Sequence, residues 1–288
     1  MREDSKVEAM MPYIIRSFRA NIFIILLFFC ILLPFVLRFV LSAQASGPNT
    51  LNNTSVEISN VSENAVISNQ SDIKPSKYSD SFSMPILMYH HIKPESTDGL
   101  TVSVDKFAKQ LDYIKEQGFE AITFARLSEK SVPQKSIILT FDDGYDNFYG
   151  NVFPLLKERG MTAVAYIIVN EIGKSGYMTR EQIKEIADAG VEIGSHTISH
   201  PDLTLMSEHR LRSELFDSKE SLEELTGKAV ISLCYPAGKY NDIVESVVSE
   251  KGYLYGLAIH NKIATFDDSY SLERYRISED IHLSAFLK

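Results

Sequence analysis

Short apolar runs alternate with amphipathic stretches between Ile86 and Ile259, and this alternation constrains the fold more than any other sequence feature. The apolar runs have the length of buried strands, and the stretches between them have the 3.6-residue period of helices. Strands that alternate with helices indicate a parallel α/β sheet, either open or closed into a barrel. In both forms, ligands bind where the strands end.

The pattern predicts seven strands and five helices. The strands are expected at Ile86–Tyr89, Ala121–Phe124, Ser136–Phe141, Ala163–Val169, Val191–Ser195, Val230–Tyr235 and Tyr255–Ile259. The helices are expected at Val104–Gln117, Asn147–Arg159, Arg180–Ala189, Ser207–Thr226 and Asp242–Lys251. Asp105 and Thr179 are expected helix starts, and Gly118, Gly190, Gly227 and Gly252 are expected stops.

The N-terminal segment carries a separate signal, because Ile22–Leu41 is almost continuously apolar and follows Arg16 and Arg19. A helix of this length spans about 30 Å, the thickness of a bilayer core. We therefore expect residues 1–21 to be cytoplasmic and residues 22–41 to form a transmembrane anchor, or a signal segment cleaved after Ala45. Residues 42–83 read as a flexible linker, and residues 84–288 as an extracytoplasmic, membrane-anchored or secreted domain.

The predicted exported domain is acidic. Residues 1–83 contain seven basic and seven acidic residues, which leaves 22 basic and 31 acidic residues in the rest of the chain. An acidic surface repels a phosphate backbone, so nucleic acid is not an expected partner. The two cysteines, Cys30 and Cys234, provide no disulfide framework.

Four of the predicted strands lead directly into polar residues. These are His90 and His91, Asp142 and Asp143, His196 with His200 four residues later, and Tyr235 with Pro236. An isolated Asp-Asp-Gly is usually a turn, and a lone histidine is usually structural. Two histidines four residues apart, combined with an aspartate from a neighbouring strand end, instead favour a metal site with open positions.

Three ordered segments, Thr140–Gly144, Ser195–His200 and Tyr235–Tyr240, together resemble the NodB-homology polysaccharide deacetylase family, carbohydrate esterase family 4. The opening segment Pro85–Ile92 resembles the branch that includes the poly-β-1,6-N-acetylglucosamine deacetylases. The resemblance implies a distorted (β/α) barrel. It also implies an enzyme that removes N-acetyl groups from an N-acetylglucosamine polymer, either an exopolysaccharide or peptidoglycan.

The resemblance implies a role for each polar residue at these strand ends. Asp143, His196 and His200 would hold a divalent metal, with zinc expected. Asp142 would be the general base, and His90, the histidine after the tyrosine, would be the general acid.

Further contacts follow from the same resemblance. Tyr235, Pro236 and Tyr240 would contact the substrate, with a backbone N–H near Tyr235 stabilising the oxyanion. Arg274 would hold Asp142 by charge pairing.

Three sequence features modify these expectations. Ala237 stands where many members of the branch carry an aromatic residue, so we expect one wall of the sugar site to be more open. Strand alternation would turn His91 away from His90, which predicts a structural role for His91. Four tyrosines are candidates either for stacking on sugar rings or for packing in the core: Tyr145, Tyr149, Tyr235 and Tyr240.

Two other functions compete with deacetylation. A catalytically inactive carbohydrate-binding barrel would have lost the base or a metal ligand, and the sequence retains all of them. An Fe(II) oxygenase uses the same two-histidine, one-carboxylate set, but such sites lie on a double-stranded β-helix and use a His-x-Asp pair, which we expect to be missing here.

Overall fold

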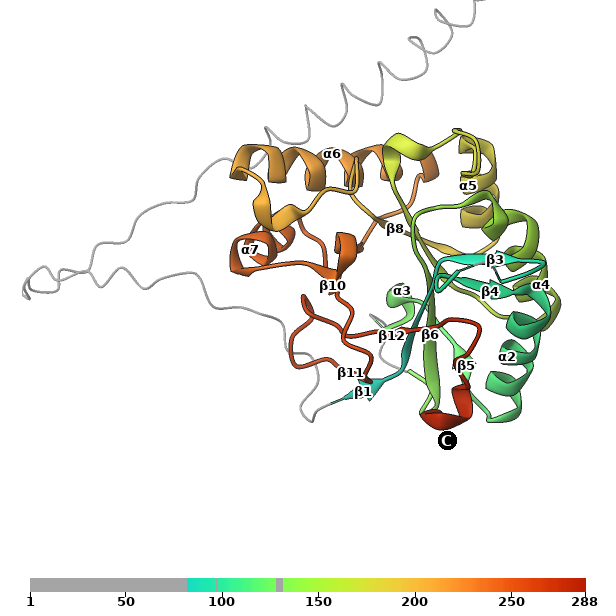
Figure 1. Ribbon diagram of the computed structural model, residues 1–288. Coiled ribbons are helices and arrows are strands. Elements are labelled where there is room, and N and C mark those ends of the chain that lie inside the picture. The colour runs from blue at the N-terminus through green and yellow to red at the C-terminus, as the bar shows by residue number, and fades with distance from the viewer. Residues whose placement is uncertain (1–81, 97, 128–131) are drawn as a thin grey trace, which may run out of the picture. The chain divides into compact units, whose positions relative to one another are not determined.

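The computed structural model describes residues 82–96, 98–127 and 132–288 (Figure 1). The predicted cytoplasmic segment, membrane anchor and nearly all of the linker lie outside these residues and stay predictions. Among the described residues, no helix combines the length and apolarity needed to cross a bilayer.

Eight parallel strands form the main sheet. Their order is β10 (Tyr255–Leu257), β9 (Ser232–Cys234), β8 (Glu192–Ser195), β7 (Val164–Ile167), β6 (Ser136–Phe141), β2 (Ile86–Tyr89) and β12 (Tyr275–Arg276), with β5 (Glu120–Ala121) also paired to β6. A single parallel bridge between Leu257 and Leu272 connects β10 to the segment that leads into β12. The sheet is therefore curled into a parallel half-barrel.

Helices lie along the outside of the curled sheet (Figure 1). They are α2 (Val104–Glu116), α4 (Phe153–Arg159), α5 (Arg180–Asp188), α6 (Glu208–Thr226) and α7 (Asp242–Glu250). The short helix α3 (Phe124–Leu127) instead packs against the inner face of the sheet. Two small sheets complete the described fold: β1 (Ser83–Met84) pairs with β11 (Ala264–Thr265), and β3 (His91–Lys93) pairs with β4 (Thr101–Ser103). Short 3₁₀ turns lie at Val169–Glu171, Leu203–Leu205, Pro236–Gly238 and Leu283–Ala285.

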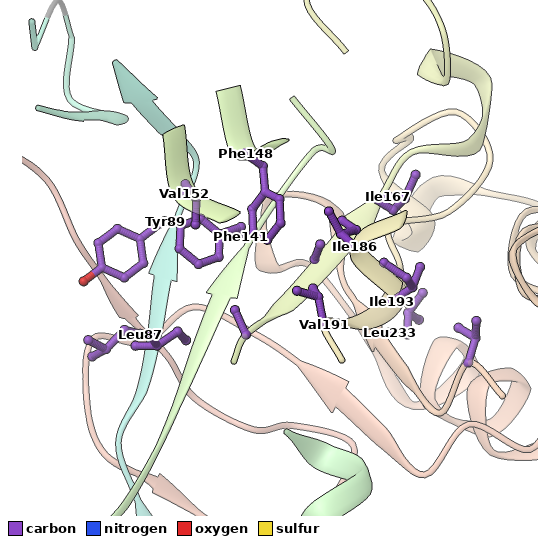
Figure 2. Packing of buried hydrophobic residues seen from close by; sticks show 14 of the residues in the cluster. Leu87, Tyr89, Phe141, Phe148, Val152, Ile167, Ile186, Val191, Ile193 and Leu233 are labelled. Carbon is purple, nitrogen blue, oxygen red and sulfur yellow. The ribbon is translucent and has the colours of Figure 1, made fainter. Parts of the chain in front are cut away.

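The core fills both faces of the sheet, because every residue of β2 and β6 is buried. On the helix-covered face, Phe141 stacks on Tyr89 with 5.1 Å between ring centroids and meets Phe148 edge-on at 5.0 Å (Figure 2). Aromatic pairs of this kind stabilise by about 1 kcal/mol beyond the area that they bury. The contact fixes the ends of β2 and β6, the two strands that lead into His90 and Asp142.

The predicted strands agree with the structure at Ile86–Tyr89 and Ser136–Phe141, and four others are shorter than predicted. The prediction at Ala121–Phe124 was wrong beyond Ala121, because α3 begins at Phe124. The first half of the helix predicted at Asn147–Arg159 is a π-helical turn, Phe148–Val152. The short strands β3, β4 and β12 lacked a sequence pattern of sufficient length.

Helix caps explain the observed starts. Thr179 begins α5, as the sequence predicted, and it forms a capping box with Gln182. Asp105 is not the cap of α2, since Ser103 accepts the N–H of Lys106 and Asp105 lies in the first turn. All four predicted stop glycines have positive φ angles.

Glu192 at the start of β8 generates a prediction about stability and pH. Its carboxylate accepts the N–H of Ala125 at 2.8 Å, and burial raises its pKa from 4.5 to about 7. The folded protein then binds a proton more tightly than the unfolded chain, so the free energy of unfolding should fall as pH rises from 4.5 to 7. Glu192→Gln should reduce this fall by about 3 kcal/mol, as measured by denaturant titration across that range.

The exposed Glu120 at β5 provides the matched control, and Glu120→Gln should keep the wild-type pH dependence. A Glu192→Gln variant with the same pH dependence as the wild type would contradict the prediction.

Candidate active site

Three predicted metal ligands meet at one edge of the sheet. Asp143 follows β6, whereas His196 and His200 follow β8. Asp143 Oδ1 lies 3.4 Å from His196 Nε2 and 3.8 Å from His200 Nε2. The ligand atoms of the three residues all lie within 4.8 Å of one another. Parallel strands end at the same edge of a sheet, and this brings residues that are distant in sequence together.

The tautomer of His196 is fixed by the backbone. Its Nδ1 lies 2.8 Å from the carbonyl oxygen of Cys234. A carbonyl can only accept, so Nδ1 carries a proton and Nε2 is the nitrogen that would supply the lone pair to a metal. This orientation by a backbone carbonyl is the usual support for a metal-binding histidine.

The spacing of these ligand atoms fits a divalent metal. Ligand atoms about 2.0–2.1 Å from a tetrahedral zinc lie about 3.3 Å apart, close to the two measured separations. His196 also favours the ionised form of Asp143: burial opposes ionisation, but the contact with His196 holds the pKa of Asp143 below its ordinary value. Asp143, His196 and His200 are therefore suited to bind a cation.

Asp142, His196 and Cys234 also lie close enough together to form a second metal-binding group. Arg274 argues against that alternative. Its guanidinium contacts both Asp142 oxygens and the Sγ of Cys234, the last at 3.0 Å. A fixed positive charge in contact with two of the three candidate ligands disfavours a cation there.

Asp142 and Arg274 form a buried bidentate ion pair. Arg274 Nη1 donates to Asp142 Oδ1 at 2.7 Å, and Nη2 donates to Oδ2 at 2.9 Å. Arg274 is completely buried and Asp142 is 3% exposed. Burial alone would raise the pKa of Asp142, but the guanidinium more than offsets this effect and holds the pKa well below its ordinary range. The predicted contact is present, and it keeps Asp142 ionised.

Backbone strain is concentrated at this site. Among the described residues, five non-glycine residues have positive φ: Asp143, Thr197, His200, Ala237 and Asn261. The first four lie in the three segments that carry the family resemblance. Such conformations cost about 1–3 kcal/mol each, and they persist where surrounding contacts determine the backbone.

Glu214 of α6 supplies such contacts for the loop that carries the two histidines. Its carboxylate accepts the N–H of Ile198 at 2.9 Å, the N–H of Ser199 at 2.9 Å and the Ser199 hydroxyl at 2.6 Å. Sequence reasoning missed Glu214. Its only sequence signal is an acidic residue on the buried face of an otherwise amphipathic helix.

The tyrosines near the site are less available than the sequence suggested. Tyr235 is completely buried and stacks on Tyr240, and its hydroxyl donates to the carbonyl of Tyr270. The backbone N–H of Tyr235 donates to Leu257 within the sheet. Ala237 is exposed, and none of the described residues accepts its N–H.

Stacking of Tyr145 or Tyr149 on sugar is not favoured either. His91 and Tyr177 both stack on Tyr145, so its ring is already in stacked contact within the protein. Tyr149 packs on Phe153 and donates to Glu185.

His90 and His91 both lie near the site, which corrects the prediction that His91 faces away. β2 ends at Tyr89 and β3 begins at His91, so strand alternation does not continue through His90. Burial lowers the pKa of His90, whereas the charges of Asp142 and Asp143 act in the opposite direction. The buried Nδ1 of His90 has no partner among the described residues.

The expectation that a His-x-Asp pair is missing was wrong, because His200 and Asp202 form this sequence, the pair associated with Fe(II) oxygenases. However, the Asp202 carboxylate binds the hydroxyl of Thr204 at 2.6 Å and the ammonium of Lys239 at 2.6 Å. It is therefore not a member of the metal-binding group. The curled parallel sheet also differs from the double-stranded β-helix that such oxygenases use.

Comparisons with known proteins agree with this site. The polysaccharide deacetylase family profile matches residues 129–256. YxkH of Bacillus subtilis (strain 168), provisionally described as a polysaccharide deacetylase, is 33% identical over 209 residues, which cover 70% of this chain and 74% of YxkH. The chain belongs to the polysaccharide deacetylase family. This chain is also similar to the poly-β-1,6-N-acetyl-D-glucosamine N-deacetylase of Staphylococcus epidermidis. The two are 27% identical over a match that covers 62% of this chain and 69% of that enzyme.

Solved structures show the same fold. The deacetylase PplD of Streptococcus pyogenes, solved in complex with acetate, has a TM-score of 0.69 and 29% identity. The match covers 73% of this chain and all of PplD. The polysaccharide deacetylase BA0330 of Bacillus anthracis has a TM-score of 0.67 and 31% identity, over 72% of this chain and 70% of that one.

Replacement of Glu214 should weaken metal binding. In Glu214→Ala the N–H groups of Ile198 and Ser199 and the Ser199 hydroxyl all lose the carboxylate that accepts them. We expect zinc affinity, measured by calorimetry, to fall about 10- to 100-fold, as for other groups that orient metal ligands. The exposed Glu224→Ala on the same helix should bind zinc normally. Equal zinc affinities for the two variants would rule out this role.

Proposed function

We propose that this polysaccharide deacetylase is a zinc-dependent enzyme that removes N-acetyl groups from an extracytoplasmic N-acetylglucosamine polymer and releases acetate. The observation that carries the proposal is an ionised carboxylate, Asp142, next to a separate metal-binding group. Two adjacent carboxylates thus have different partners, since Asp142 is paired with Arg274 and Asp143 faces two imidazoles. Hydrolysis of an amide requires both a base and an electrophile.

Asp143, His196 and His200 would hold the metal, which when bound supplies electrophilic polarisation of the acetyl carbonyl and lowers the pKa of water. Asp142 would accept the proton of the attacking water at a carboxylate oxygen. Its depressed pKa keeps it unprotonated and ready to accept throughout the neutral range. Arg274 holds the carboxylate in one orientation.

The leaving amine needs a proton, and the oxyanion needs a donor. His90 would supply the proton, since its imidazole lies within the electrostatic reach of both aspartates. The N–H of Ala237 would donate to the oxyanion, because the N–H of Tyr235 is already bonded in the sheet. A donor of this kind contributes about 3–4 kcal/mol to catalysis.

The substrate assignment rests on the sequence resemblance in Pro85–Ile92 and on the similarity to the Staphylococcus epidermidis enzyme. The candidate substrates are β-1,6-linked exopolysaccharide, as in a biofilm, and the glycan of peptidoglycan in the cell wall. Residues 22–41 would place the domain outside the cell, and the half-barrel would be the distorted (β/α) barrel of the family. A catalytically inactive carbohydrate-binding protein is disfavoured because the base, its arginine and all three ligands are present together.

The direct test is acetate release. The full-length protein in detergent, loaded with zinc, should release acetate from oligomers that are β-1,6-linked, β-1,4-linked or part of peptidoglycan, and chelation should abolish release.

Asp142→Asn should lower turnover at least about 100-fold. His90→Ala should lower turnover while zinc content, measured by atomic absorption, stays unchanged. Loss of zinc in His90→Ala would make His90 a ligand, and full turnover by Asp142→Asn would disprove the base assignment.

Removal of the arginine should change the pH dependence. In Arg274→Met the buried Asp142 loses its cation, so burial should raise its pKa and protonate it at neutral pH. We expect kcat/KM at pH 7 to fall at least about 100-fold, and the acid limb of the pH profile to move to higher pH. The exposed Arg276→Met, two residues later, is the control. An unshifted acid limb in Arg274→Met would show that Arg274 does not control the base.

A further inference from the structure

His91 and Asn147 form a hydrogen-bonded pair whose atoms can be assigned. The Oδ1 of Asn147 accepts the backbone N–H of Ile92 at 2.8 Å. A backbone N–H can only donate, so the other atom of the amide, Nδ2, must face His91. Asn147 Nδ2 lies 3.1 Å from His91 Nδ1.

The amide in turn fixes the proton on the imidazole. An NH₂ group can only donate, so His91 Nδ1 must carry a lone pair in this contact. The proton is therefore on Nε2, and a second proton on Nδ1 would point at another donor. Burial, followed by the charge of Lys93, lowers the pKa of His91 below its ordinary value and favours the same neutral form.

The His91 ring belongs to a stack of three partly exposed rings beside the site. His91 stacks on Tyr145 with 3.7 Å between centroids, and Tyr145 stacks on Tyr177 at 5.1 Å. Tyr145 interacts with Asp143, which places the stack next to the metal-binding group. Among the described residues, no group accepts the Nε2–H of His91. A partly exposed ring is thus held rigidly while one donor stays available.

We propose that His91 is a specificity-determining residue that donates its Nε2–H to an oxygen of the sugar unit next to the one being deacetylated. The inference rests on the proposed function. A neutral donor recognises the lone pairs of hydroxyl and acetamide oxygens, the acceptors that an N-acetylglucosamine polymer repeats along its length. Because Asn147 and Tyr145 fix the ring, little rotamer entropy is lost when the polymer binds.

The tautomer is tested first, without any substrate. In the full-length, zinc-loaded protein, ¹⁵N NMR should show a protonated Nε2 and an unprotonated Nδ1 for His91, with His91→Gln used to assign the signals. Asn147→Asp should move the proton of the neutral ring to Nδ1, because a carboxylate can accept from both Ile92 and His91. A protonated Nδ1 in the wild-type protein would overturn the assignment.

Binding is tested on an Asp142→Asn background, where turnover does not interfere. His91→Phe keeps a stacking ring without the donor, and His91→Gln keeps an N–H donor near the position of Nε2. We expect His91→Phe to weaken binding of N-acetylglucosamine tetramers about 3- to 10-fold, the value of one neutral hydrogen bond, and His91→Gln to restore most of it. Zinc content should be equal in all of these variants.

The outcomes separate this inference from the proposed function. Equal tetramer affinity for His91→Phe and its parent, or no tetramer binding by the parent, would contradict the role of His91. Failure of the wild-type enzyme to release acetate from every polymer would instead overturn the proposed function. The NMR result decides the tautomer in either case.

Discussion

The Asp142–Arg274 ion pair is the interaction on which the rest of the site depends. A carboxylate that is 3% exposed would be protonated without a partner, and a protonated Asp142 cannot accept a proton. The same guanidinium donates to the hydroxyl of Thr140 in β6 and to the carbonyl of Ala258, just after β10. Arg274 therefore holds the base ionised and also connects strands on opposite sides of the curled sheet.

The location of Arg274 makes this double role possible. It lies between Leu272, which bridges to β10, and β12, which pairs with β2. The segment that brings the ends of the sheet together is thus the segment that delivers the cation. Breaking a buried ion pair by removing one partner costs about 3–5 kcal/mol, so stability and the ionisation of Asp142 are coupled.

The metal-binding group depends on strained backbone rather than on side chains alone. Asp143 and His200 both have positive φ, and neither can return to an ordinary conformation without moving its ligand atom. Glu214 accepts three hydrogen bonds from the loop between the histidines and so stabilises its unusual path. Strain at these residues is offset by the hydrogen bonds that Glu214 of α6 accepts, although Glu214 is not a member of the metal-binding group.

The strands and the grouping of Asp143 with His196 and His200 could be predicted because apolar runs and His-x-x-x-His spacing are local signals. Glu214 and Cys234 could not, since their contacts depend on which helix and which strand pack beside the loop. The oxyanion donor was predicted near Tyr235. Only the structure shows that the N–H of Tyr235 donates to Leu257, whereas the N–H of Ala237 has no acceptor among the residues that the structure describes.

The two adjacent histidines show why alternation fails at a functional strand end. His91 pairs through β3 with β4 rather than with the main sheet, so the faces of β2 do not determine where it points. The break at His90 allows both rings to lie near the metal-binding group in different chemical environments. His90 Nδ1 is unpaired among the described residues, whereas His91 Nδ1 is fixed by Asn147. A ring that feels the charges of both aspartates suits transfer of a proton, and a ring whose tautomer is locked suits recognition, so this break separates the two tasks.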